Sequence, residues 1–207
     1  PGQDLTAADY TLELNASSNA VLAGEIVTFT YRLLDWNDED VTAQYTLRTD
    51  ISPALGYQAQ GEGSYLFTKA DAFTFFVSVD VLGTTLVEAE QVIVSPGAAS
   101  QLAIDADSPL VQAGDVVTMS AEITDAWGND ADGDVTYTVS PSAAVAGNEI
   151  TPTLLGSYTV TGTLVGTSAT ATDTFTVESS QPISLDISLS SYDVERGDGI
   201  QVFVDMR

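Results

Sequence analysis

Apolar and polar residues alternate with a period of two along much of the chain. This alternation is typical of β-strands with one buried and one solvent-facing side, because successive side chains of a strand point to opposite faces. The alternating segments include residues 27–33, 73–81, 158–164 and 170–177. Turn-forming residues, chiefly Gly beside Asp, Asn or Thr, separate such segments at intervals of about 8–12 residues. The pattern predicts an all-β fold of antiparallel β-sandwiches.

One short pattern occurs three times. It runs from a first strand through a turn, with Gly at positions 24, 114 and 197, so that the repeats are spaced by 90 and 83 residues. This periodicity predicts tandem domains over 1–95, including an N-terminal linker, and 98–179, followed by the first strands of an incomplete third repeat at 183–207. The junctions are short and contain Pro96 and Pro182, so we expect them to be restricted.

The spacing between the first two repeats shrinks from 90 to 83 residues toward their ends. The first repeat therefore has about seven extra residues in its middle, near 52–63. Because insertions are tolerated best at the surface, this segment, with Tyr57, is expected to form an enlarged loop.

The second repeat contains a series of short motifs at residues 113–118, 124–129, 135–137, 156–160 and 175–177. They resemble the bacterial immunoglobulin-like repeats of invasin- and intimin-type adhesins and other surface proteins. The first repeat keeps the pattern, but has Asp35-Trp36-Asn37-Asp38 where the second has a Gly-containing turn. The resemblance implies tandem immunoglobulin-like sandwiches that serve as spacers, adhesive tips or shells.

Composition excludes several functions. The chain has 30 acidic and 5 basic residues, a formal net charge of −25, no Cys and no His. Such a charge repels nucleic acids and anionic lipids. Disulfides, thiolate metal sites and imidazole catalysis are impossible. No apolar run approaches the ~20 residues of a membrane span, so direct membrane insertion is not expected. We expect a non-enzymatic protein, extracellular or on the cell surface.

The acidic segment 125–134 is the strongest candidate site. It contributes the oxygen-bearing side chains of Asp125, Asn129, Asp130, Asp132 and Asp134. Calcium prefers six to eight oxygen ligands, so this segment predicts a calcium site, although the bidentate Glu of an EF-hand is missing. The alternative interpretation is that Asp125 and Gly128-Asn129 simply build the turn after a strand. Residues 35–40 form the equivalent acidic loop in the first repeat.

Two further features permit more than one interpretation. Trp36 and Trp127 lie near matching strand ends and either stack on sugars or pack at the rim of a sandwich. Asn15-Ala16-Ser17 matches the acceptor motif for N-glycosylation.

These observations favour a rod-like stalk segment of a secreted or cell-surface microbial protein, with structural or adhesive function. Its expected partners are other copies or neighbouring repeats, and glycans or a host receptor. One alternative is a filament or surface-layer subunit that polymerises by strand exchange through residues 183–207. A second alternative is a carbohydrate-binding accessory module.

Overall fold

The computed structural model describes residues 5–179, 185–190, 195–197 and 199–206 of the 207-residue chain. Its contacts form two compact units. The first comprises the residues up to 103 together with 122–135 and 163–170; the second comprises 104–121, 136–162 and the residues from 171 onward. The third repeat lies partly outside the described residues. The domain boundaries expected from the repeats stay predictions.

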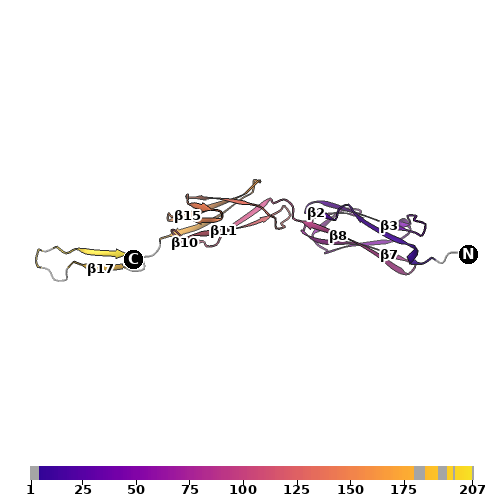
Figure 1. Cartoon of the computed structure of the whole chain (residues 1–207), viewed down its shortest axis with the longest axis horizontal. Helices are drawn as coiled ribbons and strands as arrows, with labels where there is room; N and C mark the ends of the chain where they lie inside the picture. Colours follow the sequence, from indigo (N-terminus) through magenta and orange to yellow (C-terminus); the bar gives the residue numbers. More distant parts are fainter. Residues whose placement is uncertain (1–4, 180–184, 191–194, 198, 207) are drawn as a thin grey trace. The chain divides into compact units, whose positions relative to one another are not determined.

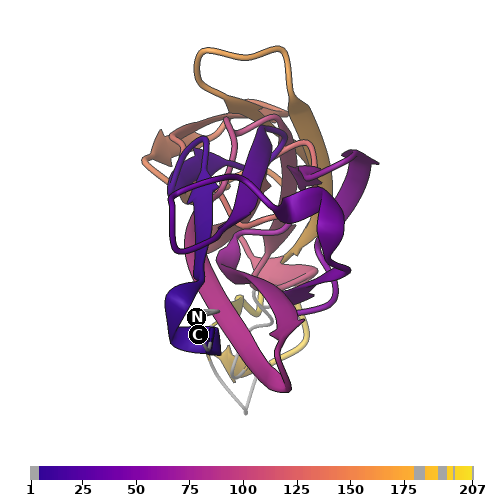
Figure 2. The same ribbon diagram turned by 90° about the vertical axis from the view of Figure 1, so that its right-hand side faces the viewer.

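The first sandwich consists of two four-stranded sheets, with strand orders β1-β3-β6-β5 and β2-β8-β7-β4 (Figure 1). Its strands are β1 (Thr11–Ala16), β2 (Ala20–Leu22), β3 (Ile26–Leu34), β4 (Leu47–Ser52), β5 (Tyr57–Gly61), β6 (Ser64–Phe67), β7 (Asp71–Val81) and β8 (Thr84–Ser95). Two single 3-10 turns accompany them, η1 (Ala7–Asp9), the short coil at the indigo end of the ribbon in Figure 2, and η2 (Thr42–Gln44). The pairings are antiparallel, except that β2 runs parallel to β8.

The second sandwich has the same topology. Its sheets have the orders β13-β14-β11-β9 and β10-β16-β15-β12, so each strand corresponds to the strand numbered eight lower. The strands are β9 (Gln101–Ala106), β10 (Leu110–Gln112), β11 (Val117–Thr124), β12 (Val135–Ser140), β13 (Ala144–Ala146), β14 (Glu149–Thr151), β15 (Gly156–Leu164) and β16 (Thr170–Glu178). The all-β fold class of tandem immunoglobulin-like sandwiches is confirmed.

The third repeat contributes a two-stranded antiparallel sheet, β17 (Leu185–Leu189) with β18 (Val202–Met206). This pairing corresponds to that of β1 with β3 in the first sandwich, as the repeated sequence pattern predicts.

Aromatic residues fill the core of the first unit. Phe29 of β3 stacks on Phe75 of β7, with ring centroids 4.2 Å apart and planes inclined by 8°. Both side chains come from inward positions of alternating strands and join the buried cluster with Val27, Val77 and Phe67. In the second unit the stacked pair is Tyr158 of β15 with Phe175 of β16, at 5.3 Å, and these two strands are neighbours in one sheet. The period-two pattern therefore places these side chains on the inward faces of the strands, and in the first sandwich the Phe29–Phe75 stack joins the two sheets.

The enlarged loop expected near residues 52–63 is only partly a loop. Tyr57–Gly61 form the edge strand β5, which pairs with β6 across a turn at residues 61–64. The Tyr57 ring packs against Tyr65, Phe67 and Phe73, with centroid distances of 5.6, 6.2 and 6.2 Å. Packing of this ring against the aromatic core anchors β5, which has five residues where its counterpart β13 has three.

Phe75→Ala is expected to lower the free energy of unfolding by about 3–5 kcal/mol, because it removes a fully buried ring and leaves a cavity. Urea denaturation followed by tryptophan fluorescence measures the loss. Val87→Ala on the neighbouring strand is the control; its side chain is 55% exposed, and the expected change is within about 0.5 kcal/mol. Equal losses in the two variants would contradict this assignment of the core.

Candidate functional site: the turn after β11

The predicted site begins with a tight turn directly after β11. The Asp125 N–H donates to the Asn129 carbonyl at 2.9 Å, and the Gly128 N–H donates to the Asp125 carbonyl at 3.2 Å. Gly128 has φ = 83°, a left-handed conformation that Gly adopts without steric cost. The turn belongs to segment 122–135, which is part of the first unit although it continues β11.

The carboxylate of Asp125 is fully buried and accepts four N–H donors. Oδ1 accepts from the backbone of Trp127 at 2.8 Å and of Asn129 at 2.9 Å. Oδ2 accepts from the Gly97 backbone at 2.7 Å and from Asn129 Nδ2 at 2.8 Å. Four donors match the four lone-pair positions of an ionised carboxylate, so a cation at Asp125 would have to displace some of them.

These donors also set the ionisation of Asp125. Burial opposes the charged form, but the side-chain bond from Asn129 and the backbone bonds from Gly97, Asn129 and Trp127 outweigh it. Together they lower the pKa of Asp125 from 3.8 to about 2. Asp125 is therefore a charged anchor for surrounding N–H groups at neutral pH.

Asn129 extends the network to the segment between β6 and β7. Its Nδ2 donates to the Thr68 carbonyl at 2.9 Å, and its Oδ1 accepts from the Ala70 N–H at 2.8 Å. One side-chain amide thus satisfies a backbone donor and a backbone acceptor about 60 residues earlier in the chain. Within the first unit, Asn129 fastens segment 122–135 to the first sandwich.

Trp127 packs at the same place. Gly24, with φ = 97°, leaves space for the indole: a Cβ at this position would lie 2.8 Å from Trp127 Nε1. Gly97 makes a similar close approach, since its own Cβ would lie 3.1 Å from the Ala23 carbonyl oxygen. Trp127 remains 45% exposed and Trp36 51% exposed. The packing of Trp127 on Gly24 agrees with the rim interpretation, and sugar stacking stays a prediction for both rings.

The structure brings together only two of the five predicted calcium ligands, Asp125 and Asn129. Asp130, Asp132 and Asp134 are exposed, and the first two line an open surface pocket of about 360 Å3 with residues 96–99. Within the part of the chain that the structure describes, no three acidic side chains gather closely enough to hold a metal ion. The turn interpretation fits this geometry, and calcium binding stays a prediction.

The first repeat builds the same turn from different residues. Asp35 Oδ1 accepts from the Asn37 and Glu39 backbones at 2.8 and 3.0 Å. Asp38, with φ = 61°, takes the left-handed conformation of Gly128. Glu39 follows at the position of Asn129, and a carboxylate accepts hydrogen bonds but cannot donate one to a carbonyl. The two loops therefore share a backbone, and only the second has the side-chain amide.

No family model matches this chain, and no curated protein matches it. Among solved structures, the Escherichia coli adhesin FdeC aligns with 18% identity over 99% of this chain and 75% of its own, with a TM-score of 0.49. Invasin, described as a bacterial integrin-binding protein, aligns with 16% identity over 97% of this chain and a TM-score of 0.44. This chain spans 48% of that invasin chain.

Domains 5–6 of the S-layer protein SbsC align with 19% identity over 83% of this chain and all of theirs, with a TM-score of 0.32. At such identities a likeness concerns the fold and leaves the function open. The assignment of an immunoglobulin-like fold therefore depends on the strand order described above.

No described helix is long and apolar enough to cross a membrane.

Asp125→Asn is expected to lower the free energy of unfolding by about 2–4 kcal/mol at neutral pH, because a buried amide cannot accept all four donors. The folded pKa lies below the unfolded value of 3.8, so the wild-type carboxylate stabilises the fold fully above about pH 4. This contribution is lost as the pH falls through about 2. Urea unfolding of the wild type and of Asp125→Asn across this pH range measures the difference between their free energies of unfolding. The other acidic residues titrate in both proteins, so their contributions cancel in this difference. A difference independent of pH would contradict the role of the charged carboxylate.

Proposed function

We propose that this chain is a non-enzymatic, rod-like stalk segment of a secreted or cell-surface microbial protein. The observation that carries the proposal is the network of Asp125 and Asn129. The network ties the linker residue Gly97 and segment 122–135 to the first sandwich by direct hydrogen bonds. Because segment 122–135 leads from β11 into β12, we propose that the network limits rotation about the linker. A stalk needs such restraint to hold its binding end away from a surface.

The chemistry of the described residues supports a structural function. Asp125 is the single buried polar or charged residue among them, and its oxygens are engaged by N–H donors. Its carboxylate therefore has no free lone pair with which to accept a proton from a substrate. The chain has neither His nor Cys, so it offers no imidazole base and no thiolate nucleophile.

A surface location agrees with the charge of −25, which keeps a protein soluble and separate from other acidic macromolecules. FdeC is named as an adhesin, invasin as an integrin-binding protein and SbsC as an S-layer protein. We propose neighbouring repeats as the principal partners. Calcium, glycans and a host receptor are further proposed ligands.

The restraint is tested by spin-label distances. The chain has no Cys, so Gln91→Cys and Ala146→Cys, at exposed positions of β8 and β13, create the two labelling sites. We expect a narrow distance distribution, and a clearly wider one when Asn129→Ala removes the bonds to Thr68 and Ala70. Asn37→Ala, in the loop of the first repeat, is the matched control and is expected to leave the distribution narrow. A distribution already wide in the parent protein would refute the restrained stalk.

A second candidate function is assembly through the third repeat. Side chains of β17 and β18 that share one face are apolar and exposed, among them Ile187 (61%), Val202 (58%) and Val204 (60%). The corresponding face of β1 and β3 includes Leu12 and Leu33, which are buried in the core of the first unit. An amphipathic two-stranded sheet is marginally stable alone, so pairing with strands of another copy would stabilise it.

Sedimentation velocity across a wide range of protein concentration distinguishes the two functions. Assembly through the third repeat predicts a series of larger species that grows with concentration and disappears with Val204→Asp, which places a charge on the apolar face. Val87→Asp, at an exposed position of β8, is the control and is expected to leave assembly unchanged. A single monomeric species at all concentrations would exclude assembly and leave the stalk proposal intact.

A further inference from the structure

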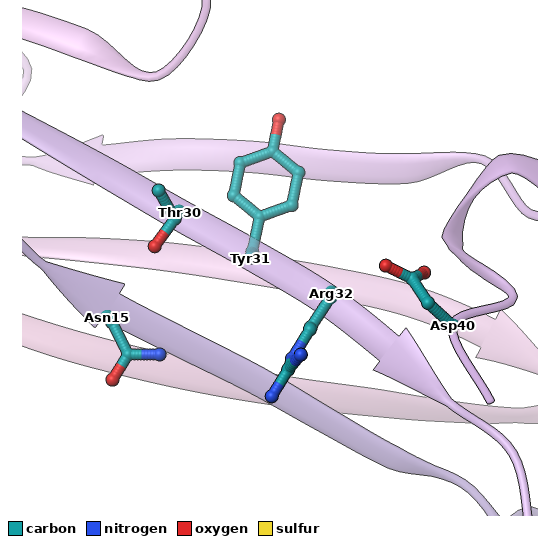
Figure 3. A pocket seen from close by; sticks show the side chains of 5 residues that line it. All are labelled: Asn15, Thr30, Tyr31, Arg32 and Asp40. Carbon is teal, nitrogen blue, oxygen red and sulfur yellow. The ribbon is translucent and has the colours of Figure 1, made fainter. Parts of the chain in front are cut away.

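A polar groove lies on the solvent side of β1 and β3. It is lined by Asn15, Thr30, Tyr31, Arg32 and Asp40 and encloses about 350 Å3 (Figure 3). Asn15 lies directly opposite Thr30 in the strand pairing. Figure 3 shows the side chains of Asn15, Thr30 and Arg32 on the same side of the two strands, with the Tyr31 ring on the other side. Three polar side chains therefore converge on one open surface.

The charged side chains of this groove are held by neighbours. Arg32 Nε donates to Glu13 at 2.6 Å, and the Asp40 carboxylate accepts from the Thr42 N–H at 2.9 Å. The side-chain bond from Thr42 is also the main cause of the lowered pKa of Asp40. Asn15 is different: it is exposed, and its amide has no hydrogen-bond partner among the residues that the structure describes. The groove thus presents one uncommitted amide beside fixed donors and acceptors.

The sequence around Asn15 is that of an acceptor site for N-linked sugars. Asn15-Ala16-Ser17 is the one place in the chain where Ser or Thr follows Asn at the second position. Asn15 therefore combines an acceptor motif, an exposed side chain and a position in the polar groove.

We propose that Asn15 carries an N-linked glycan whose first sugar lies in the groove over Thr30 and Arg32. In the transfer, the Asn15 amide nitrogen bonds to the anomeric carbon of a lipid-diphosphate-linked oligosaccharide. The bond from this carbon to the phosphate oxygen breaks, the lipid diphosphate leaves with the electron pair, and the proton lost by the amide is taken up by the released diphosphate. The proposal depends on the proposed function only for the extracytoplasmic location where such transfer occurs.

The groove suits a sugar that is already attached. Sugar hydroxyls both donate and accept, and here they meet the Thr30 hydroxyl, the Arg32 guanidinium and the Asp40 carboxylate. An open groove binds a free monosaccharide weakly, but covalent attachment raises the local concentration to a level at which weak contacts suffice. The glycan would also cover part of edge strand β1, which reduces unwanted pairing with other strands.

The folded structure fixes when the transfer takes place. Asn15 is part of the β1–β3 ladder, and Ser17 Oγ accepts from the Thr28 N–H at 3.0 Å. The acceptor motif is therefore engaged in the folded sheet and not free to enter an enzyme active site. Transfer must precede the pairing of β1 with β3, while the chain is still unfolded during export.

Mass spectrometry of the protein isolated from the cells that make it tests the attachment. We expect the peptide containing Asn15 to be heavier by the mass of an oligosaccharide. Expressed in the same cells, Ser17→Ala is expected to lower the modified fraction at least about tenfold, whereas Ser17→Thr, which preserves the motif, retains it. Asn37→Gln, an Asn outside any such motif, is expected to have no effect. Unmodified Asn15 in the isolated wild-type protein overturns the proposal.

The place of the first sugar is tested on the same glycoprotein by NMR. Nuclear Overhauser contacts between the first sugar and the Thr30 methyl group are expected in the wild type, and their loss in Arg32→Gln at unchanged glycan content. A glycan without such contacts in the wild type overturns the placement in the groove. If Asn15 is unmodified and the spin-label distance distribution is narrow, the glycan proposal is wrong and the stalk proposal is unaffected.

Discussion

The buried carboxylate of Asp125 determines the arrangement around the turn after β11. A buried anion is unfavourable unless donors surround it, so its four N–H partners have to be present together. They come from the turn itself, from the linker at Gly97 and from Asn129, which in turn binds the backbone near β7. One ionised group thereby links a local turn, a linker and a distant part of the first sandwich. Its burial also makes the first residue of the acidic segment 125–134 a structural anchor.

Much of the fold was predictable from the sequence, and the physical reason is the period of two. The buried Val77, Val79 and Val81 alternate with the polar Ser78 and Asp80, which identifies a strand and its inward face without knowledge of its partners. The repeated pattern similarly predicted that the second sandwich has the topology of the first. Strand β5 was missed because its residues Gln58, Ala59 and Gln60 show no alternation; pairing with β6 and the ring of Tyr57 define it.

The candidate site was predictable in composition but not in its contacts. Acidic residues near Asp125 suggested a cation, whereas the structure surrounds that carboxylate with N–H donors. The partners of Asn129 are main-chain atoms of Thr68 and Ala70, which have no characteristic side chain for a sequence pattern to reveal. The closest sequence signals were Gly24 and Gly97, where the absence of a Cβ permits close approach. Glu39 in place of Asn129 further shows that equal backbones in two repeats do not imply equal contacts.

The choice of main-chain partners by Asn129 has a consequence for how such repeats diverge. Every residue other than proline has the same carbonyl and N–H, so the positions of Thr68 and Ala70 can change their side chains without loss of these bonds. Within the first unit, this contact is thus insensitive to most side-chain substitutions at positions 68 and 70. The residues that have to be kept are instead Asn129 itself and the close-packed Gly24 and Gly97, so sequence divergence is expected to spare these three positions.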